Sequence, residues 1–175
     1  FRVESNNVAA MLYVDGADDR IGIATDAPDT TLHIVSADRE VLKIESTDGG
    51  SGDGPTILLK RKSTSVANDD EIGEIRFQGM NSPAGDTIDY ARIMAGIDNV
   101  DSDTPREAGR LIFYIEKSSE QMEMLRLEGS NGYVGIRETT PSKMLDVGNG
   151  ASGADILCFD IYTHDGGVTS SDRRM

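Results

Sequence analysis

A short pattern that returns once along the chain constrains the fold more than any other feature of the sequence. Aligned without a gap, residues 11–34 lie over residues 124–147, and Met, Leu, Gly, Gly, Ile, Pro and Leu coincide at seven positions. The offset of 113 residues is far longer than the roughly 20 to 50 residues of a solenoid repeat. The sequence therefore predicts one small structural device that the chain uses twice.

Each copy reads as strand, glycine-containing turn, short strand, proline-containing turn and short strand. Gly22 and Gly135 each stand between two β-branched residues, where the missing side chain permits a bulge or the close approach of another backbone. Pro28 and Pro141 end the preceding strand and fix the turn. Such a compact hairpin has little apolar surface to bury alone, so we expect each copy to need neighbours.

Strand signals dominate the rest of the chain. Short runs of β-branched, aromatic or alternating residues are separated by clusters of Gly, Asn, Asp and Pro, and spacing typical of helices is nearly absent. A stretch at 118–125 that could begin a helix runs directly into strand-like alternation. The predicted strands are residues 8–14, 31–35, 41–45, 56–62, 71–79, 89–97, 109–117, 122–129 and 156–162.

Residues 71–128 read as an antiparallel meander of four strands, because apolar residues recur at every second position and predict one buried and one solvated face. Its connections at 80–86 and 98–108 are rich in turn formers or in acidic residues, and binding residues concentrate in such surface loops. We predict that these loops contact a receptor. The candidate residues are Met80, Asn81, Asp98, Asn99, Asp101 and Asp103.

Glycine-rich stretches at 46–55 and 148–155 indicate module boundaries, since glycine removes the Cβ restraint on the backbone. The predicted organisation is a repeat-containing shaft module at 1–45, a linker and strand at 46–70, the antiparallel module at 71–128, the second repeat at 129–150 and a neck at 151–175.

Charge and composition narrow the choice of partners and architecture. A net charge of −14 repels phosphate backbones and anionic bilayers, so we expect neither nucleic acid binding nor membrane insertion. Aromatic residues make up 5% and tryptophan is absent, so the apolar groups are small and evenly spread. Burial is easier if several copies surround a common axis. We therefore expect an all-β, elongated homotrimeric fibre of short strands, with the antiparallel meander between two hairpin repeats; a plain β-sandwich is the alternative.

The repeat pattern, an apolar residue followed by Gly, Ile, small polar residues, Pro and Leu-Asp/His-Val/Ile, resembles the repeated motif of bacteriophage tail fibres and tailspikes. The likeness is strongest to fibres that carry an intramolecular chaperone of the endosialidase type. Residues 163–175, THDGGVTSSDRRM, are similar to the junction with that chaperone, whose opening reads Ser-Asp-Arg-Arg and then an apolar residue. The stretch from 73–79 through 108–117 resembles the sheet module that precedes the repeat in such fibres.

The resemblance implies a homotrimer in the virion tail, outside the cell, that contacts other tail proteins and a host receptor, either a glycan or an outer-membrane protein. It also implies that a downstream chaperone domain is released by self-cleavage between Ser171 and Asp172. Two positions depart from the family pattern, because Ala24 and Arg137 stand where another glycine is common.

Two sequence patterns imitate enzyme motifs. GNGASG at 148–153 matches GxGxxG, but strand-like residues follow in place of the helix that would hold a pyrophosphate, which favours a flexible linker. The letters of a hydrolase triad occur at His164, Asp165, Ser170 and Ser171. A triad needs three converging elements, so a single turn is the better interpretation.

Metal ligation is not expected either. Asp98 and Asp101 with Asp103 fail the EF-hand frame, because Asp103 and Gly109 stand where Gly and Glu are required, although an irregular cation site stays open. His33 and His164 lack a closely spaced ligating partner, and Cys158 is most simply a small apolar group. We predict no catalytic residue, no metal and no cofactor.

The predicted function is structural and adhesive: a trimeric shaft of a viral tail fibre that presents loops to a host receptor. One alternative is a subunit of a cellular surface filament or adhesin. A polysaccharide-degrading tailspike is a further alternative. It would need two carboxylates about 5 to 9.5 Å apart, and the 31 acidic residues of the chain are too many to single out a pair.

Overall fold

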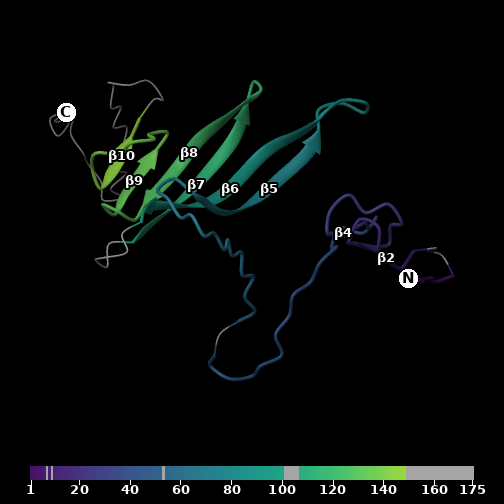
Figure 1. The fold of residues 1–175 in the computed structure, drawn as a ribbon. Helices are drawn as coiled ribbons and strands as arrows, with labels where there is room; N and C mark the ends of the chain where they lie inside the picture. The colour runs from purple at the N-terminus through teal and green to yellow at the C-terminus, as the bar shows by residue number, and fades with distance from the viewer. Residues whose placement is uncertain (7, 9, 53, 101–106, 149–175) are drawn as a thin grey trace, which may run out of the picture. The chain divides into compact units, whose positions relative to one another are not determined.

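The computed structural model of the chain describes residues 1–6, 8, 10–52, 54–100 and 107–148. The regular elements in these residues are all β-strands, and no helix occurs among them (Figure 1). The strands form two sheets. Contacts divide the chain into two units, Phe1–Ile57 and a second unit that begins at Leu58, and each unit holds one sheet. The predicted all-β class is therefore confirmed for the described residues.

The first unit holds a four-stranded sheet with its strands in chain order. The strands are β1 (Arg2–Val3), β2 (Leu12–Asp15), β3 (Arg20–Ile23) and β4 (Leu32–Ile34). The first three pair antiparallel, whereas β4 lies parallel to β3. The connection at 24–31 must therefore return the chain to the end of β3 where that strand began.

The second unit holds a six-stranded sheet in the order β10-β9-β8-β7-β6-β5. Its strands are β5 (Glu71–Met80), β6 (Thr87–Asn99), β7 (Ala108–Lys117), β8 (Glu120–Glu128), β9 (Tyr133–Ile136) and β10 (Leu145–Val147). All neighbours pair antiparallel except β9 and β10, which are parallel. The predicted four-stranded meander is confirmed as β5 to β8.

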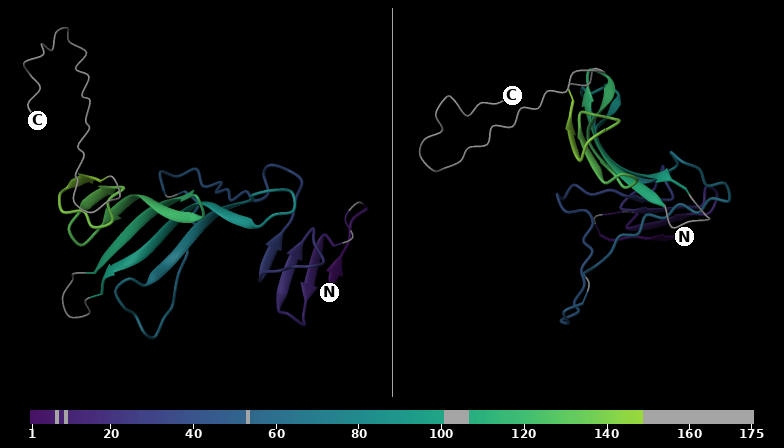
Figure 2. Two further views of the ribbon diagram at one scale, coloured as in Figure 1. Left: turned by 90° about the horizontal axis from the view of Figure 1, so that it is seen from above. Right: turned by 90° about the vertical axis from the view of Figure 1, so that its left-hand side faces the viewer.

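The six-stranded sheet is strongly curved (Figure 2). Its pairing register shifts at four places, which leaves Ile72, Tyr90, Asp98 and Met124 without a directly opposed residue. Such bulges bend the strand that carries them and increase its twist. The bulges therefore account for the curvature.

The two repeat copies fold into the same device with the same register. In the first copy, formed by β2 to β4, Tyr13 lies opposite Gly22, and Gly22 lies opposite His33. In the second copy, formed by β8 to β10, Arg126 lies opposite Gly135, and Gly135 lies opposite Asp146. The second copy shares β8 with the meander, so one strand serves both elements.

A backbone crossing explains the repeat glycines. A Cβ atom built on Gly22 would lie 2.2 Å from the carbonyl oxygen of Thr25, and one built on Gly135 would lie 2.2 Å from that of Glu138. The chain thus turns back directly over the glycine on its way to the parallel strand, and a side chain there would occupy the path of the backbone.

The turn itself runs through a left-handed residue in both copies. Ala24 has a φ of 58° and Arg137 a φ of 53°, a region that costs an L-residue about 1–2 kcal/mol. Pro28 and Pro141, further along the same connection, are buried. Ala24 and Arg137 therefore stand at a position whose backbone favours glycine.

Two predicted strands are wrong. Residues 41–45 and 56–62 lie in irregular chain and form no strand. A strand exists only beside a partner that accepts its backbone hydrogen bonds, and the described part of this chain supplies none to these residues. The predicted strand at 156–162 lies outside the described residues.

The crossing predicts that Gly22→Ala and Gly135→Ala destabilise the protein by about 3 kcal/mol or more, because a backbone oxygen cannot move aside as a flexible side chain can. Urea unfolding followed by circular dichroism measures the change. Gly16→Ala is the matched control, since nothing lies within 4 Å of a Cβ at Gly16. Equal midpoints for Gly22→Ala and the wild type would contradict the crossing.

The left-handed turn predicts that Ala24→Gly and Arg137→Gly stabilise the protein by about 0.5–1 kcal/mol, because relief of the φ strain exceeds the extra entropy of the unfolded chain. Thermal unfolding of each variant provides the measurement. Ala27→Gly, a change at an exposed turn residue of the same loop without a positive φ, should lower the stability instead. Destabilisation by all three glycines would show that the turn is unstrained.

Candidate functional site

Each sheet gathers apolar residues on one of its two faces, and these two surfaces are called the apolar faces. In the first sheet the strand register places Val3, Leu12, Val14, Ile21, Ile23, Leu32 and Ile34 on this face. The opposite face carries Arg2, Tyr13, Asp15, Arg20, Gly22 and His33. The alternation that predicted strands thus separates the side chains of this sheet completely.

The apolar face of the second sheet runs across all six strands, and charged residues join it only beside the β7–β8 turn, where Lys117 pairs with Glu120. Its apolar members are Gly73, Ile75, Phe77, Gly79, Ile88, Ala91, Ile93, Ala95, Ile97, Gly109, Leu111, Phe113, Ile115, Met122, Leu125, Leu127, Val134, Ile136, Leu145 and Val147. The final six from Leu125 onward occupy the same positions as Leu12, Val14, Ile21, Ile23, Leu32 and Ile34 in the first repeat copy. Both copies therefore present an equivalent apolar stripe.

These faces remain open to solvent in the single chain. Phe77 and Ile75 are each 52% exposed, Ile115 is 47% exposed, and Leu32 on the first sheet is 55% exposed. Apart from the turn prolines and glycines, the apolar residues that are buried among the described ones are Ala10, Met94 and Ile112. Extended apolar surface of this kind marks an interaction site in soluble proteins.

On the polar face of the second sheet, in contrast, arginine and carboxylate side chains contact one another, while Nε of Arg92 and Nε of Arg110 have no hydrogen-bond partner among the described residues. Arg126 donates to Glu123 at 2.8 Å and lies 3.4 Å from Glu128. The hydrogen bond from Arg126 to Glu123 raises the pKa of the guanidinium above its ordinary value. Arg92 donates to Glu74 at 3.3 Å and stacks 4.4 Å from the ring centroid of Tyr114.

The two buried apolar side chains of the six-stranded sheet lie on this polar face, not on the apolar one. Met94 and Ile112 are directly paired across β6 and β7 and are 3% and 1% exposed. Arg92 and Tyr114 on the same two strands are also paired with each other on this face. Long charged side chains cover apolar groups with their aliphatic stems, so the polar face forms its own cover and the apolar face does not.

The predicted receptor-contact residues are divided by the structure. Met80 ends β5 and is exposed, and Asn81 opens the turn to β6, where its backbone N–H donates to the carbonyl oxygen of Asp86 at 3.1 Å. The placement of Asp98 and Asn99 in a loop is wrong, because β6 continues through a bulge to Asn99. The Asp98 carboxylate accepts the N–H of Ser130 at 3.3 Å.

Several sequence candidates lie outside the described residues, namely Asp101, Asp103, Cys158, His164, Asp165, Ser170, Ser171 and Asp172. Within the described ranges, no cluster of three or more His, Cys, Asp or Glu side chains could hold a metal ion. No helix able to cross a membrane occurs in the same residues.

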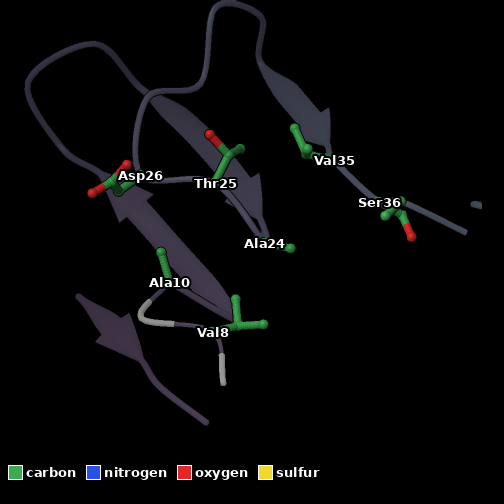
Figure 3. Close-up of a pocket in the computed structure, with 8 residues that line it drawn as sticks. Val8, Ala10, Ala24, Thr25, Asp26, Val35 and Ser36 are labelled. Carbon is green, nitrogen blue, oxygen red and sulfur yellow. The ribbon is translucent and has the colours of Figure 1, made fainter. Parts of the chain in front are cut away.

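A shallow depression of about 500 Å³ lies in the first unit beside the repeat turn (Figure 3). Small and apolar residues line it, and its polar side chains come from Thr25, Asp26 and Ser36. A hydrolytic site requires a base, an acid or two carboxylates in reach of one substrate. One carboxylate and two hydroxyl groups do not form such a set, so the depression is not a candidate active site.

The position opposite each repeat glycine holds the proline turn in place. Asp146 is 4% exposed and accepts two hydrogen bonds from Ser142, from the backbone N–H at 2.9 Å and from the hydroxyl at 3.0 Å. The equivalent His33 lies with Nδ1 3.0 Å from Oδ1 of Asp29. The backbone hydrogen bond from Ser142 lowers the pKa of Asp146 below its usual value, with a smaller contribution from the charge of Lys143.

No protein-family model and no curated protein sequence matches this chain. The two apolar faces, together with the exposed turn between β5 and β6, are therefore the candidate functional surfaces on the evidence of the chain itself.

The Asp146 turn gives a pH prediction. Because the folded pKa is lowered, the carboxylate contributes stability that is complete above the unfolded value near 3.8 and is lost as pH falls through the lower folded value. Asp146→Asn should therefore be less stable than the wild type at pH 7, with a difference that shrinks below about pH 4.

Urea unfolding at about pH 7, 5 and 3 spans this window and provides the measurement. Asp86→Asn, a change at an exposed carboxylate of the same unit, is the control for general charge effects. A stability difference between Asp146→Asn and the wild type that stays constant over this range would contradict the role of the charged form.

Proposed function

We propose that this chain is a structural and host-adhesion segment of a viral tail fibre, in which three copies form a shaft and present loops to a host receptor. The observation that supports this proposal is the pair of solvent-exposed apolar faces, one on each sheet. The resemblance of the repeat and of the final residues to tail fibres supplies the biological setting.

Energetics favour association of identical chains through these faces. Burying a side chain that is half exposed contributes about 1 kcal/mol to the free energy of association. Association itself costs about 4–15 kcal/mol in lost translational and rotational entropy. Many such side chains in each copy are needed, and the apolar faces offer them. A net charge of −14 opposes contact elsewhere on the surface, so an apolar face is the surface on which copies can meet.

In this proposal the polar face of the six-stranded sheet and its hairpin turns point outward. Met80 and Asn81, exposed at the end of β5, are the described candidates for receptor contact. Cleavage between Ser171 and Asp172 by a downstream chaperone domain stays part of the proposal on the strength of the sequence resemblance alone.

Native mass spectrometry should find particles of three chains. Ile75→Ser with Phe77→Ser, both half exposed in the single chain, should shift the population toward single chains, because each copy loses about 2 kcal/mol of burial. Arg76→Ser with Gln78→Ser changes the opposite face of the same strand and should leave the trimer intact.

A wild-type protein that is a stable single chain at micromolar concentration would overturn the proposal. Equal dissociation of both pairs of variants would overturn the assignment of the apolar face as the interface.

A further inference from the structure

Two segments with strand-like sequences have no strand partner in the described part of the chain. They are VLKIE at 41–45 and TILLK at 56–60, and they flank a glycine-rich connection. Neither segment forms a backbone–backbone hydrogen bond with the residues that the structure describes. Their apolar side chains are unusually open, with Leu42 68%, Ile57 69% and Leu58 77% exposed.

Exposed apolar side chains on an unpaired backbone are unfavourable in free energy for a chain that does not associate. Runs of β-branched and apolar residues favour a sheet, yet here Leu42, Ile57 and Leu58 are mostly exposed to solvent. Unpaired strand backbone and exposed apolar side chains together form a template for pairing with another chain. An isolated chain would gain nothing from keeping these residues extended and apolar.

The contacts of Leu59 show where the second segment lies on the six-stranded sheet. Leu59 reaches the apolar face of the six-stranded sheet, where its Cβ lies 3.1 Å from the place that a side chain on Gly73 would take. Arg61, slightly further along the chain, forms an ion pair with Asp70 at 2.9 Å. The segment is thus held at the start of β5, beside the exposed apolar face of the six-stranded sheet.

The charge of the second segment favours an identical chain as its partner. Residues 54–68 contain Lys60, Arg61 and Lys62 and no acidic residue, in a chain with a net charge of −14. Lys60 and Lys62 form no ion pair within the described residues. A basic stretch in an acidic chain is complementary to the surface of an identical neighbour, which also carries the same unpaired segments and the same apolar faces.

We propose that residues 41–45 and 56–60 are β-strands between copies: in the assembled particle their backbone groups pair with a second copy of this chain, and their apolar side chains enter the shared core. The proposal rests on the proposed trimer and adds the pairing that no single chain can make. The glycine-rich connection then serves to let the two segments reach a neighbouring copy.

Hydrogen exchange on the native full chain, read by mass spectrometry, tests the pairing directly. Backbone amides in 41–45 and 56–60 should exchange at least about a hundredfold more slowly in the assembled particle than the amides of 46–52, where Asp48 and Gly50 donate only to side-chain oxygens of Ser46 and Asp48. Dilution into single chains, or the Ile75→Ser/Phe77→Ser variant, should remove the protection.

Proline substitution gives an independent readout. Lys43→Pro and Lys60→Pro remove one backbone donor each, and neither donor forms a backbone hydrogen bond among the described residues of the single chain. Loss of one such bond in each of three copies should raise the dissociation constant about a hundredfold. Lys43→Ala and Lys60→Ala control for the lost side chains, and Gly49→Pro controls for a proline in the connection.

The outcomes separate this inference from the proposed function. Three-chain particles with fast exchange in both segments would overturn the inference and leave the trimer standing. Single chains throughout would overturn both. Protection from exchange that persists in single chains would show that the segments pair within one chain. Protection that appears only when a different protein is bound would identify that protein as the partner. Each result overturns pairing between copies.

Discussion

A single layer of β-sheet has two faces, and in the six-stranded sheet of this protein the large apolar side chains are buried within the chain only on the polar face. The polar face of the six-stranded sheet carries guanidinium–carboxylate contacts and an arginine stacked on Tyr114, and Met94 and Ile112 on the same face are buried. The apolar face has no comparable cover, and residues such as Ile75 and Phe77 stay half exposed. Every functional proposal for the chain depends on this asymmetry, because apolar area removed from water is the main driving force for association.

The repeat shows how little sequence is needed to place a parallel strand beside a hairpin. The fold of each repeat copy depends on two backbone features: a glycine at the point where the returning chain passes, and a residue with left-handed φ that turns the chain back. The position opposite the glycine tolerates different chemistry, since Asp146 and His33 each contact the residue that follows the proline. Backbone geometry is therefore repeated more strictly than side-chain identity, because a clash with a backbone oxygen has no alternative solution.

Where sequence and structure disagree, the reason is pairing. The meander over 71–128 could be predicted because its alternation is long and its partner strands are neighbours in sequence. The parallel partner of β9, the four bulges and the extension of β6 through Asp98 could not be predicted, since they depend on which strands meet and in what register. Residues 41–45 and 56–62 carry an equally strong strand signal and fail to form strands within the chain, because propensity describes what a residue tolerates in a sheet and supplies no neighbour.

The amino-acid sequence by itself determined the all-β class of the described residues, the twofold use of the repeat and the glycines on which it depends, since periodicity and missing side chains are properties of local chain chemistry. Alternation within each strand is a property of the sequence, but tertiary structure alone decided that neighbouring strands turn their apolar sides to the same face of each sheet. It also decided that Met94 and Ile112 are buried on the other face and that the apolar face remains open. Register carries that decision: a shift of one residue in any strand would turn its apolar side chains to the opposite face.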